Sequence, residues 1–264
     1  MTIPQALTIA GSDSGGGAGI QADIKTMQMR GVFATSVITA ITAQNTCGVN
    51  HIEMASTASV RAQIAAIAAD FTIRAHKIGM LGTADMIACV AVSLRDCNFG
   101  ALVLDPVMIA KGGAPLLQSD AIAALKCELL PRATLITPNL PEAEQLAGIR
   151  ISDDADIARA ARILRQQGAH AVLIKGGHGQ GDSCRDWLFH DGETLTLDNP
   201  RHATPHTHGT GCTLSACITA ELAKGATLTD AVRTAKAYIS AAIAHPLNIG
   251  HSHGPVNHWA YDET

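Results

Sequence analysis

The stretch Thr207-His208-Gly209-Thr210-Gly211-Cys212-Thr213-Leu214-Ser215 decides how the rest of the chain is interpreted. Two glycines bracket a threonine, and residues 212–223 are mostly small and apolar, which predicts a buried helix. A glycine-rich turn before a helix leaves several backbone N–H groups without partners at the positive end of the helix dipole. Taken alone, the pattern is compatible with an anion-binding cradle and also with a purely architectural turn.

Cys212 follows these glycines directly, in the first turn of the predicted helix. Because the field at a helix start favours a thiolate, we expect the pKa of Cys212 to be lowered. An anion cradle with a potential base beside it fits phosphoryl transfer better than most other reactions.

The composition favours one α/β domain spanning residues 1–264. Apolar residues make up 47% of the chain and aromatic residues only 3%, so the core must be built from Ala, Val, Ile and Leu. Small side chains of this kind suit helices that pack closely on a parallel sheet. The net charge of −4, with no basic block, excludes an electrostatic nucleic-acid footprint.

Cysteines, histidines and hydropathy exclude several other classes of protein. The seven cysteines are scattered and form no C-x-x-C pair, which argues against a zinc site and a secreted disulfide framework. Among the twelve histidines, the pair His251 and His253 suggests only adventitious surface metal binding. No apolar run is long enough to span a bilayer, and the first residues lack the features of a signal peptide. We therefore expect a cytoplasmic protein with no membrane partner.

Apolar strands and helical segments alternate along the chain, which predicts a mostly parallel sheet covered by helices on both faces. Strands are predicted at residues 6–10, 37–43, 76–81, 101–105, 134–138 and 171–175, within a total of about seven parallel strands. Helices are predicted at residues 20–30, 59–71 with Ser59 as N-cap, 83–97, 119–130, 154–167 and 212–223, with a last one from Thr227 to His245. A hairpin around Asp191-Gly192 adds a small antiparallel piece.

Polar loops follow the predicted strands, at residues 11–19, 44–46, 105–113, 139–142, 175–177 and 207–213. We expect them to converge on one edge of the sheet. The glycine loop at 11–19 matches neither a P-loop nor a dinucleotide fingerprint, because the lysine of the first and the third glycine and distal acid of the second are missing. It therefore either approaches a small ligand closely or is simply a mobile loop.

Four polar residues in the other loops are candidates for chemistry. Asp105 and Lys175 end strands, where α/β enzymes place functional groups, and a lysine there could contact a phosphate. Asn139 and Glu142 have the spacing of a helix capping box. The same pair could instead order metal-bound water near a phosphate, and the spacing alone favours the cap.

Seven blocks in a fixed order resemble the hydroxymethylpyrimidine/phosphomethylpyrimidine kinases, the thiamine-biosynthesis branch of the ribokinase-like superfamily. The blocks are residues 10–23, 43–46, 77–80, 104–108, 137–142, 175–177 and 208–212, and the similarity continues through residues 254–256. The resemblance implies a ribokinase-like three-layer α/β/α sandwich. It also implies transfer of the ATP γ-phosphate to 4-amino-5-hydroxymethyl-2-methylpyrimidine, and then to its monophosphate to give the pyrophosphate.

The resemblance further implies a substrate site around Gln44. A primary amide offers a donor and an acceptor side by side, which matches the ring nitrogen and exocyclic amine of an aminopyrimidine. The residues implied around the ring are Gly11, Asp23, Met80 and Val107.

On the phosphate side, the resemblance implies that ATP and Mg²⁺ bind near the strand ends. Asp105, Asn139 and Glu142 would serve the metal and the phosphates, with Asp105 and Glu142 holding Mg²⁺ partly through water. Lys175 would face the phosphate tail. The implied anion hole comprises Gly209, Thr210 and Gly211, and Cys212 would accept the proton of the alcohol.

Some positions depart from common patterns, and two alternative functions stay open. Cys212 stands where many sugar kinases of the superfamily have Asp, Ser14-Gly15 replaces a frequent Pro-Ser, and Ala114 stands where an acid is common after the Lys111 loop. The alternatives are a pyridoxal or pyridoxine kinase and a non-catalytic pyrimidine sensor. The phosphate-site residues are all present, which argues against the sensor. The family also suggests a homodimer.

Overall fold

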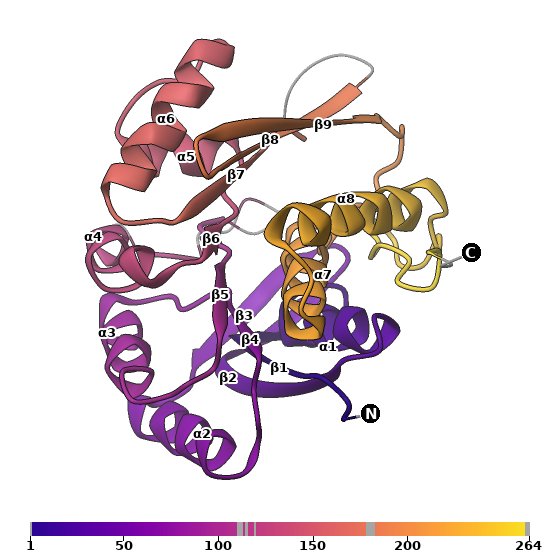
Figure 1. Cartoon of the computed structure of the whole chain (residues 1–264). Coiled ribbons are helices and arrows are strands. Elements are labelled where there is room, and N and C mark those ends of the chain that lie inside the picture. The colour runs from indigo at the N-terminus through magenta and orange to yellow at the C-terminus, as the bar shows by residue number, and fades with distance from the viewer. Residues whose placement is uncertain (1, 110–112, 114–115, 119, 178–182, 262–264) are drawn as a thin grey trace.

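The described strands form one central sheet, in the order β3-β2-β1-β4-β5-β6-β7-β8-β9 (Figure 1). The computed structural model describes residues 2–109, 113, 116–118, 120–177 and 183–261. The strands in this part of the chain are β1 (Gln5–Asp13), β2 (Phe33–Asn45), β3 (Gly48–Met54), β4 (Ala75–Ile78), β5 (Ala101–Leu104), β6 (Leu135–Ile136), β7 (Ala171–Lys175), β8 (Ser183–His190) and β9 (Glu193–Pro200).

The sheet has six parallel strands, β2, β1, β4, β5, β6 and β7, among the described residues. The prediction of about seven parallel strands was therefore wrong, whereas the mostly parallel sheet and the hairpin at Asp191-Gly192 are confirmed. Antiparallel strands occur at both edges, because β3 pairs with β2 and the β8–β9 hairpin pairs with β7. The sequence did not reveal β3 because this edge strand is largely exposed and has no apolar run.

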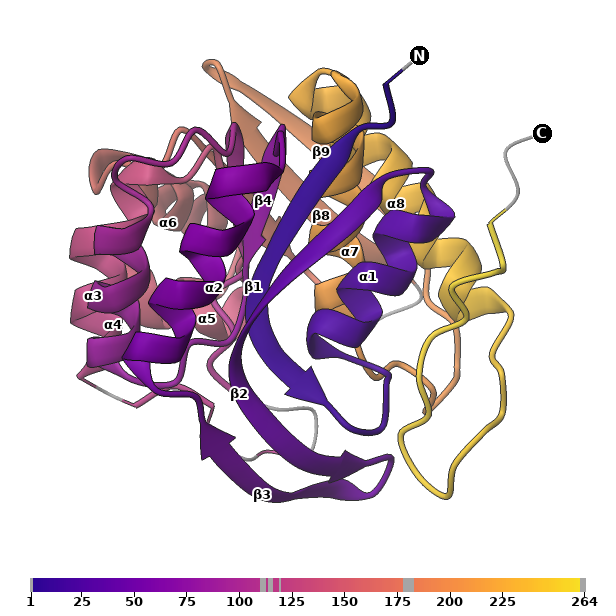
Figure 2. The ribbon, with the colours of Figure 1, turned by 90° about the horizontal axis from the view of Figure 1, so that it is seen from below.

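Helices cover both faces of the sheet, which confirms the three-layer architecture (Figures 1 and 2). One core cluster joins the sheet to α2, α3, α5 and α6, and two others join it to α1, α7 and α8. The helices are α1 (Gly19–Met29), α2 (Thr57–Asp70), α3 (Ala84–Ser93), α4 (Ala121–Ala124), α5 (Leu140–Ala147), α6 (Asp154–Gln166), α7 (Thr210–Lys224) and α8 (Leu228–Ala244). No helix in the described ranges is both long enough and apolar enough to traverse a bilayer.

Small side chains let α7 lie close to its neighbours. Ala216, Ala220 and Ala223 of α7 are buried together with Met27 of α1 and Ala6 of β1. Helices approach closely only where the facing side chains are short. The predicted core of small aliphatic residues is confirmed, and it brings the start of α7 to the ends of the central strands.

Two predicted helices differ in their boundaries. The side chain of Ser56, not of Ser59, caps α2 by accepting a hydrogen bond from the Ser59 amide at 3.2 Å. The segment predicted as one helix at 119–130 contains the short α4, a π-helical turn (Leu125–Leu129) and a 3₁₀ turn (Leu130–Arg132), while Ser119 lies outside the described residues. Pro131 cannot donate a helical hydrogen bond, which accounts for the change of helix type at this point.

The order of the strands places a crevice at the middle of the sheet. From β1 the chain crosses to β2 on one side, and it later returns to β4 on the other side of β1. In open parallel sheets, ligands bind beyond the carboxyl ends of the strands at such a reversal of strand order. We therefore look for the site where β1 and β4 end.

The cap of α2 provides a test of stability that involves no residue of this crevice. Replacing Ser56 by Ala should lower the free energy of unfolding by about 1 kcal/mol, because the Ser59 amide loses its partner. Ser59→Ala is the matched control and should change it by less than about 0.5 kcal/mol. Urea unfolding of the two variants decides this, and an equal loss in both would contradict the cap seen here.

Candidate active site

A cavity of about 680 Å³ opens at the carboxyl ends of the central strands. This volume lies in the range of small-molecule sites. Its walls come from the segments after β1, β4, β5, β6 and β7, from the ends of β2 and β9, from β8, and from the start of α7 and part of α8. The predicted convergence of the polar loops is thus confirmed for their described residues; residues 110–112, including Lys111, and Ala114 lie outside these.

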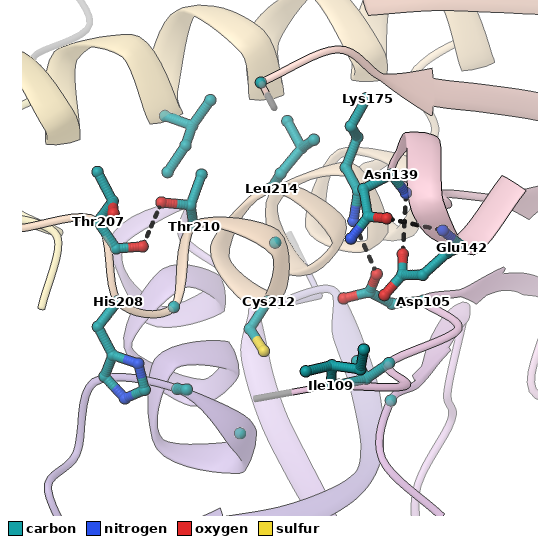
Figure 3. Close-up of a pocket in the computed structure, with 18 of the residues that line it drawn as sticks. Asp105, Ile109, Asn139, Glu142, Lys175, Thr207, His208, Thr210, Cys212 and Leu214 are labelled. Atoms are coloured by element: carbon teal, nitrogen blue, oxygen red, sulfur yellow. Dashed lines mark hydrogen bonds and ion pairs between the residues drawn. The ribbon is translucent and has the colours of Figure 1, made fainter. Parts of the chain in front are cut away.

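The start of α7 lies against the glycine loop because two glycines meet there. Gly209, with φ of +82°, precedes the helix, and a Cβ on it would stand 1.7 Å from the carbonyl oxygen of Gly17. In the described structure no side chain caps this helix start. The Thr210 hydroxyl donates to the Thr207 carbonyl at 2.7 Å and so does not cap the helix (Figure 3). The first turn of α7 therefore presents backbone donors to the cavity, which fits the predicted anion cradle.

A buried ion pair lies opposite this helix start. Lys175 Nζ is 3.1 Å from Asp105 Oδ1, and the hydroxyls of Thr137 and Ser215 donate to the same carboxylate at 3.2 Å each. Burial opposes ionisation of Asp105, but Lys175 and Lys77 outweigh it and hold the pKa of Asp105 below its usual value. A Cβ on Gly211 of α7 would lie 3.3 Å from Lys175 Nζ, so the backbone comes close to the charged pair.

Asn139 and Glu142 form the capping box that their spacing predicts. Asn139 Oδ1 accepts from the Glu142 amide at 2.9 Å, and Glu142 Oε2 accepts from the Asn139 amide at 2.8 Å (Figure 3). Both residues also line the cavity, so capping does not remove them from the site. Burial and the nearby Asp105 raise the pKa of Glu142 even though Lys175 favours its ionisation.

The two carboxylates, Asp105 and Glu142, thus share one lysine at the cavity wall. No group of three or more His, Cys, Asp or Glu side chains suited to a metal occurs among the described residues. Mg²⁺ is commonly held by one or two carboxylates together with water and substrate phosphates. Two carboxylates beside a single lysine fit an ion bound in this way.

The predicted lowering of the Cys212 pKa is wrong for the free protein. Burial raises the pKa of Cys212 to about 11, and Asp23 and Asp105 add to the effect, although Lys77 opposes it. In Figure 3, the Cys212 sulfur lies between His208 and the Asp105–Lys175 pair. Burial and the two carboxylates both follow from segments distant in the sequence, so the residues around Cys212 carry no sign of them.

The structure also changes the role expected of Asp23. This residue of α1 is fully buried, and it accepts from Lys77 Nζ and from the Thr8 hydroxyl, both at 2.6 Å. Asp23 does not itself line the cavity, and it is linked to the cavity through Lys77, which does. Lys77, which lines the cavity, was not predicted as a site residue. A lysine inside an apolar strand indicates a paired, functional charge, and this was the signal that could have identified it.

The other side of the cavity contains the remaining residues implied for the substrate. Gln44, Gly11, Met80 and Val107 all line it. A Cβ on Gly11 would lie 3.1 Å from the Met80 sulfur, so glycine leaves room for that side chain.

Two residues missed by the sequence interpretation accompany Gln44. His208 Nε2 is 2.8 Å from Asp13 Oδ2, and both residues line the cavity. Asp13 also accepts from the amides of Gly15, Gly17 and Ala18, at 2.8 to 3.0 Å. The glycine loop is thus folded around a buried carboxylate. Nothing in the sequence around Asp13 or His208 predicts that the two side chains pair.

The raised pKa of Cys212 predicts that its thiol is protonated in the free protein near neutral pH. The thiolate absorbance of the protein should then equal that of Cys212→Ser up to about pH 9, since an unperturbed thiol has a pKa of ~8.5. Ultraviolet difference spectra of the two proteins measure this. A difference that appears with a midpoint below about 8.5 would contradict the burial argument.

Known proteins share this architecture along the whole chain. Residues 13–257 match the family described as phosphomethylpyrimidine kinase. A hydroxymethylpyrimidine/phosphomethylpyrimidine kinase of Haemophilus influenzae is 63% identical over 263 residues, which are 98% of each chain. The ADP complex of a Bacillus subtilis pyridoxal kinase aligns with a TM-score of 0.89 and 40% identity, covering 98% of both chains. A phosphomethylpyrimidine kinase of Clostridium difficile aligns with a TM-score of 0.80 and 43% identity over 89% of this chain and 97% of its own. The fold is ribokinase-like, and the chain belongs to the phosphomethylpyrimidine kinase family.

Proposed function

We propose that the protein transfers the γ-phosphate of ATP to 4-amino-5-hydroxymethyl-2-methylpyrimidine, and then phosphorylates the monophosphate to the pyrophosphate. The observation that carries this proposal is the open start of α7, which faces Lys175 and holds Cys212 in its first turn. The name of the H. influenzae relative agrees with both steps, and the B. subtilis relative binds ADP.

The aminopyrimidine occupies the side of the cavity formed by Gln44, Met80, Val107 and Gly11. There the Gln44 amide pairs with the ring nitrogen and the exocyclic amine, and the hydroxymethyl group points toward Cys212. This placement is supported by the position of the Cys212 sulfur between the two sides of the cavity (Figure 3).

The phosphates of ATP occupy the other side. Lys175, Thr210 and the amides of residues 209–212 bind the migrating phosphoryl group, while Asn139 assists at the nucleotide phosphates. Asp105 and Glu142 hold Mg²⁺, partly through water, and the ion supplies positive charge that neutralises the phosphates. Close contact of the backbone at Gly211 with Lys175 supports this arrangement.

Cys212 accepts the proton of the substrate alcohol. The new P–O bond forms as the bond to ADP breaks, and the hydroxyl proton passes to the Cys212 sulfur. Because the transition state of phosphoryl transfer is loose, this proton leaves late. Lys77 favours the thiolate that the step requires. The second acceptor is a phosphate with a second pKa of ~6, as in phosphoserine, so it is already ionised and needs no base.

Replacing Cys212 by Ala should slow the first phosphorylation by about 10²-fold or more and the second much less. With the pKa of Cys212 at about 11, the thiolate is a minority form. The kcat/KM for the alcohol should therefore rise about tenfold per pH unit between about pH 7 and pH 9 in the wild type, and not in the variant. Separate ADP-release assays with each acceptor measure both effects. Equal losses in the two steps would show that Cys212 acts only through packing.

Pyridoxal phosphorylation is the second candidate, and it is favoured by the likeness to the pyridoxal kinase structure. The amide of Gln44 suits an aminopyrimidine better, since pyridoxal has no amino group beside a ring nitrogen. An ADP-release assay with both alcohols should give the larger kcat/KM for the aminopyrimidine. A larger value for pyridoxal would reverse the assignment.

The resemblance also supports a cytoplasmic homodimer of single-domain chains. Light scattering after size-exclusion chromatography measures the assembly directly.

A further inference from the structure

The amide of Gln44, which rests at the end of β2, touches two other side chains. One of its terminal atoms lies 3.2 Å from Nε2 of His208, and the other lies 3.2 Å from the hydroxyl oxygen of Thr42. The two terminal atoms of a glutamine amide exchange places by a half-turn, so their partners decide which is oxygen and which is nitrogen. His208 and Thr42 therefore determine what Gln44 offers to a ligand.

Asp13 determines that Nε2 of His208 carries a hydrogen. It accepts backbone hydrogen bonds from the glycine loop, and although burial works against ionisation, His208 and these amides keep its pKa below the usual value. A carboxylate 2.8 Å from His208 Nε2 requires a hydrogen on that nitrogen. Nε2 therefore has no lone pair with which to accept from Gln44.

Thr42 determines which atom of the Gln44 amide lies at its other end. Its hydroxyl hydrogen is directed to the carbonyl oxygen of Ser12 at 2.9 Å, which leaves the hydroxyl oxygen free to accept. A Gln44 nitrogen turned toward His208 would meet an N–H already directed to Asp13 and would find no acceptor there, whereas a nitrogen turned toward Thr42 finds the free hydroxyl oxygen. The favoured orientation therefore places the Gln44 oxygen toward His208 and the Gln44 nitrogen toward Thr42. The outer positions of the amide are then occupied, and the edge with one N–H and one oxygen lone pair stays available for a ligand.

We propose that His208, held by Asp13, is a positioning residue that locks the orientation of the Gln44 amide and thereby selects a ring with an amino group beside a ring nitrogen. The proposal deepens the proposed function and rests on it. In this orientation Thr42 holds the other end of the same amide by accepting a hydrogen bond from its nitrogen. His208 lies on the opposite side of Cys212 from the Asp105–Lys175 pair, so it does not take part in phosphoryl transfer (Figure 3).

The backbone around His208 leaves its ring little freedom. The His208 amide donates to the Gly254 carbonyl at 3.1 Å, and the Val256 amide donates to the His208 carbonyl at 3.2 Å. On the other side, a Cβ on Gly17 would stand only 2.5 Å from Cδ2 of the ring. A ring held on both sides can keep a neighbouring amide in one orientation, which an exposed histidine could not do.

The test compares the aminopyrimidine alcohol with the same alcohol lacking the amino group. In His208→Leu, kcat/KM for the amino substrate should fall about tenfold, because the Gln44 amide is no longer held in one orientation, and kcat/KM for the desamino substrate should fall by less than about twofold. His208→Gln can still donate an N–H to Asp13 and keeps a polar group beside Gln44, so it should stay within about threefold of wild type on both alcohols. The KM for ATP should not change. Equal losses on the two alcohols in His208→Leu would mean a merely structural role and would overturn the proposal.

Thr42→Val provides an independent arm that stands if His208→Leu fails to fold. It should reduce kcat/KM selectively for the amino substrate, because the Gln44 amide loses its contact with the Thr42 hydroxyl. Thr35→Val is the matched control, since the Thr35 hydroxyl makes the same kind of bond from β2, to the Ala6 carbonyl at 3.1 Å, outside the cavity. It should leave both substrates unchanged, and an equal selectivity change in it would also overturn the proposal.

Gln44→Ala separates failure of this inference from failure of the proposed function. If this variant does not discriminate between the two alcohols, then Gln44 does not read the amino group and the proposed substrate site is wrong. If it discriminates while His208→Leu and Thr42→Val lower both alcohols equally, the substrate site stands and only the positioning role is overturned.

Discussion

The contact between Gly209 and Gly17 is the constraint on which the site depends. Any side chain on Gly209 would overlap the Gly17 carbonyl, so the loop after β1 and the start of α7 can meet only through glycine. This contact places the first turn of α7, with Gly211 and Cys212, over the strand ends. The geometry of the anion cradle therefore follows from a backbone contact between segments about 190 residues apart.

Five charged side chains lie below the first turn of α7, and the lysines among them are fewer than the carboxylates. Lys77 and Lys175 face three carboxylates: Asp23, Asp105 and Glu142. Buried charges persist only when they are paired, and here two cations serve three anions. Burial is the main cause of the raised pKa of Glu142 and of Cys212, and the carboxylates add to it against the opposing lysines. The site without ligand therefore has an excess of carboxylates over lysines, and a cation that enters with the nucleotide phosphates would balance it.

Local sequence signals predicted the elements whose causes are local. Apolar runs gave the six parallel strands, and Asp191-Gly192 gave the hairpin turn. The spacing of Asn139 and Glu142 gave the capping box, and the predicted start of the last helix at Thr227 agrees with α8, whose N-cap is this residue. These features depend on residues within a few positions of one another.

Features that depend on distant neighbours were not predictable in this way. β3 lacks an apolar run and is held by pairing with β2, and the pKa of Cys212 is raised mainly by burial, with a contribution from carboxylates in α1 and after β5. The burial of Asp23, and the pairing of Asp13 with His208, likewise follow from the tertiary structure alone. The two sides of the cavity also come from different segments. In the proposed binding mode, the acceptor ring lies mainly against the glycine loop, the ends of β2 and β4, and Val107, whereas the phosphate groups lie mainly against Asp105, the segments after β6 and β7, and the start of α7. Evolution can thus exchange the alcohol that such an enzyme accepts by altering one set of segments, while inheriting the transfer machinery intact.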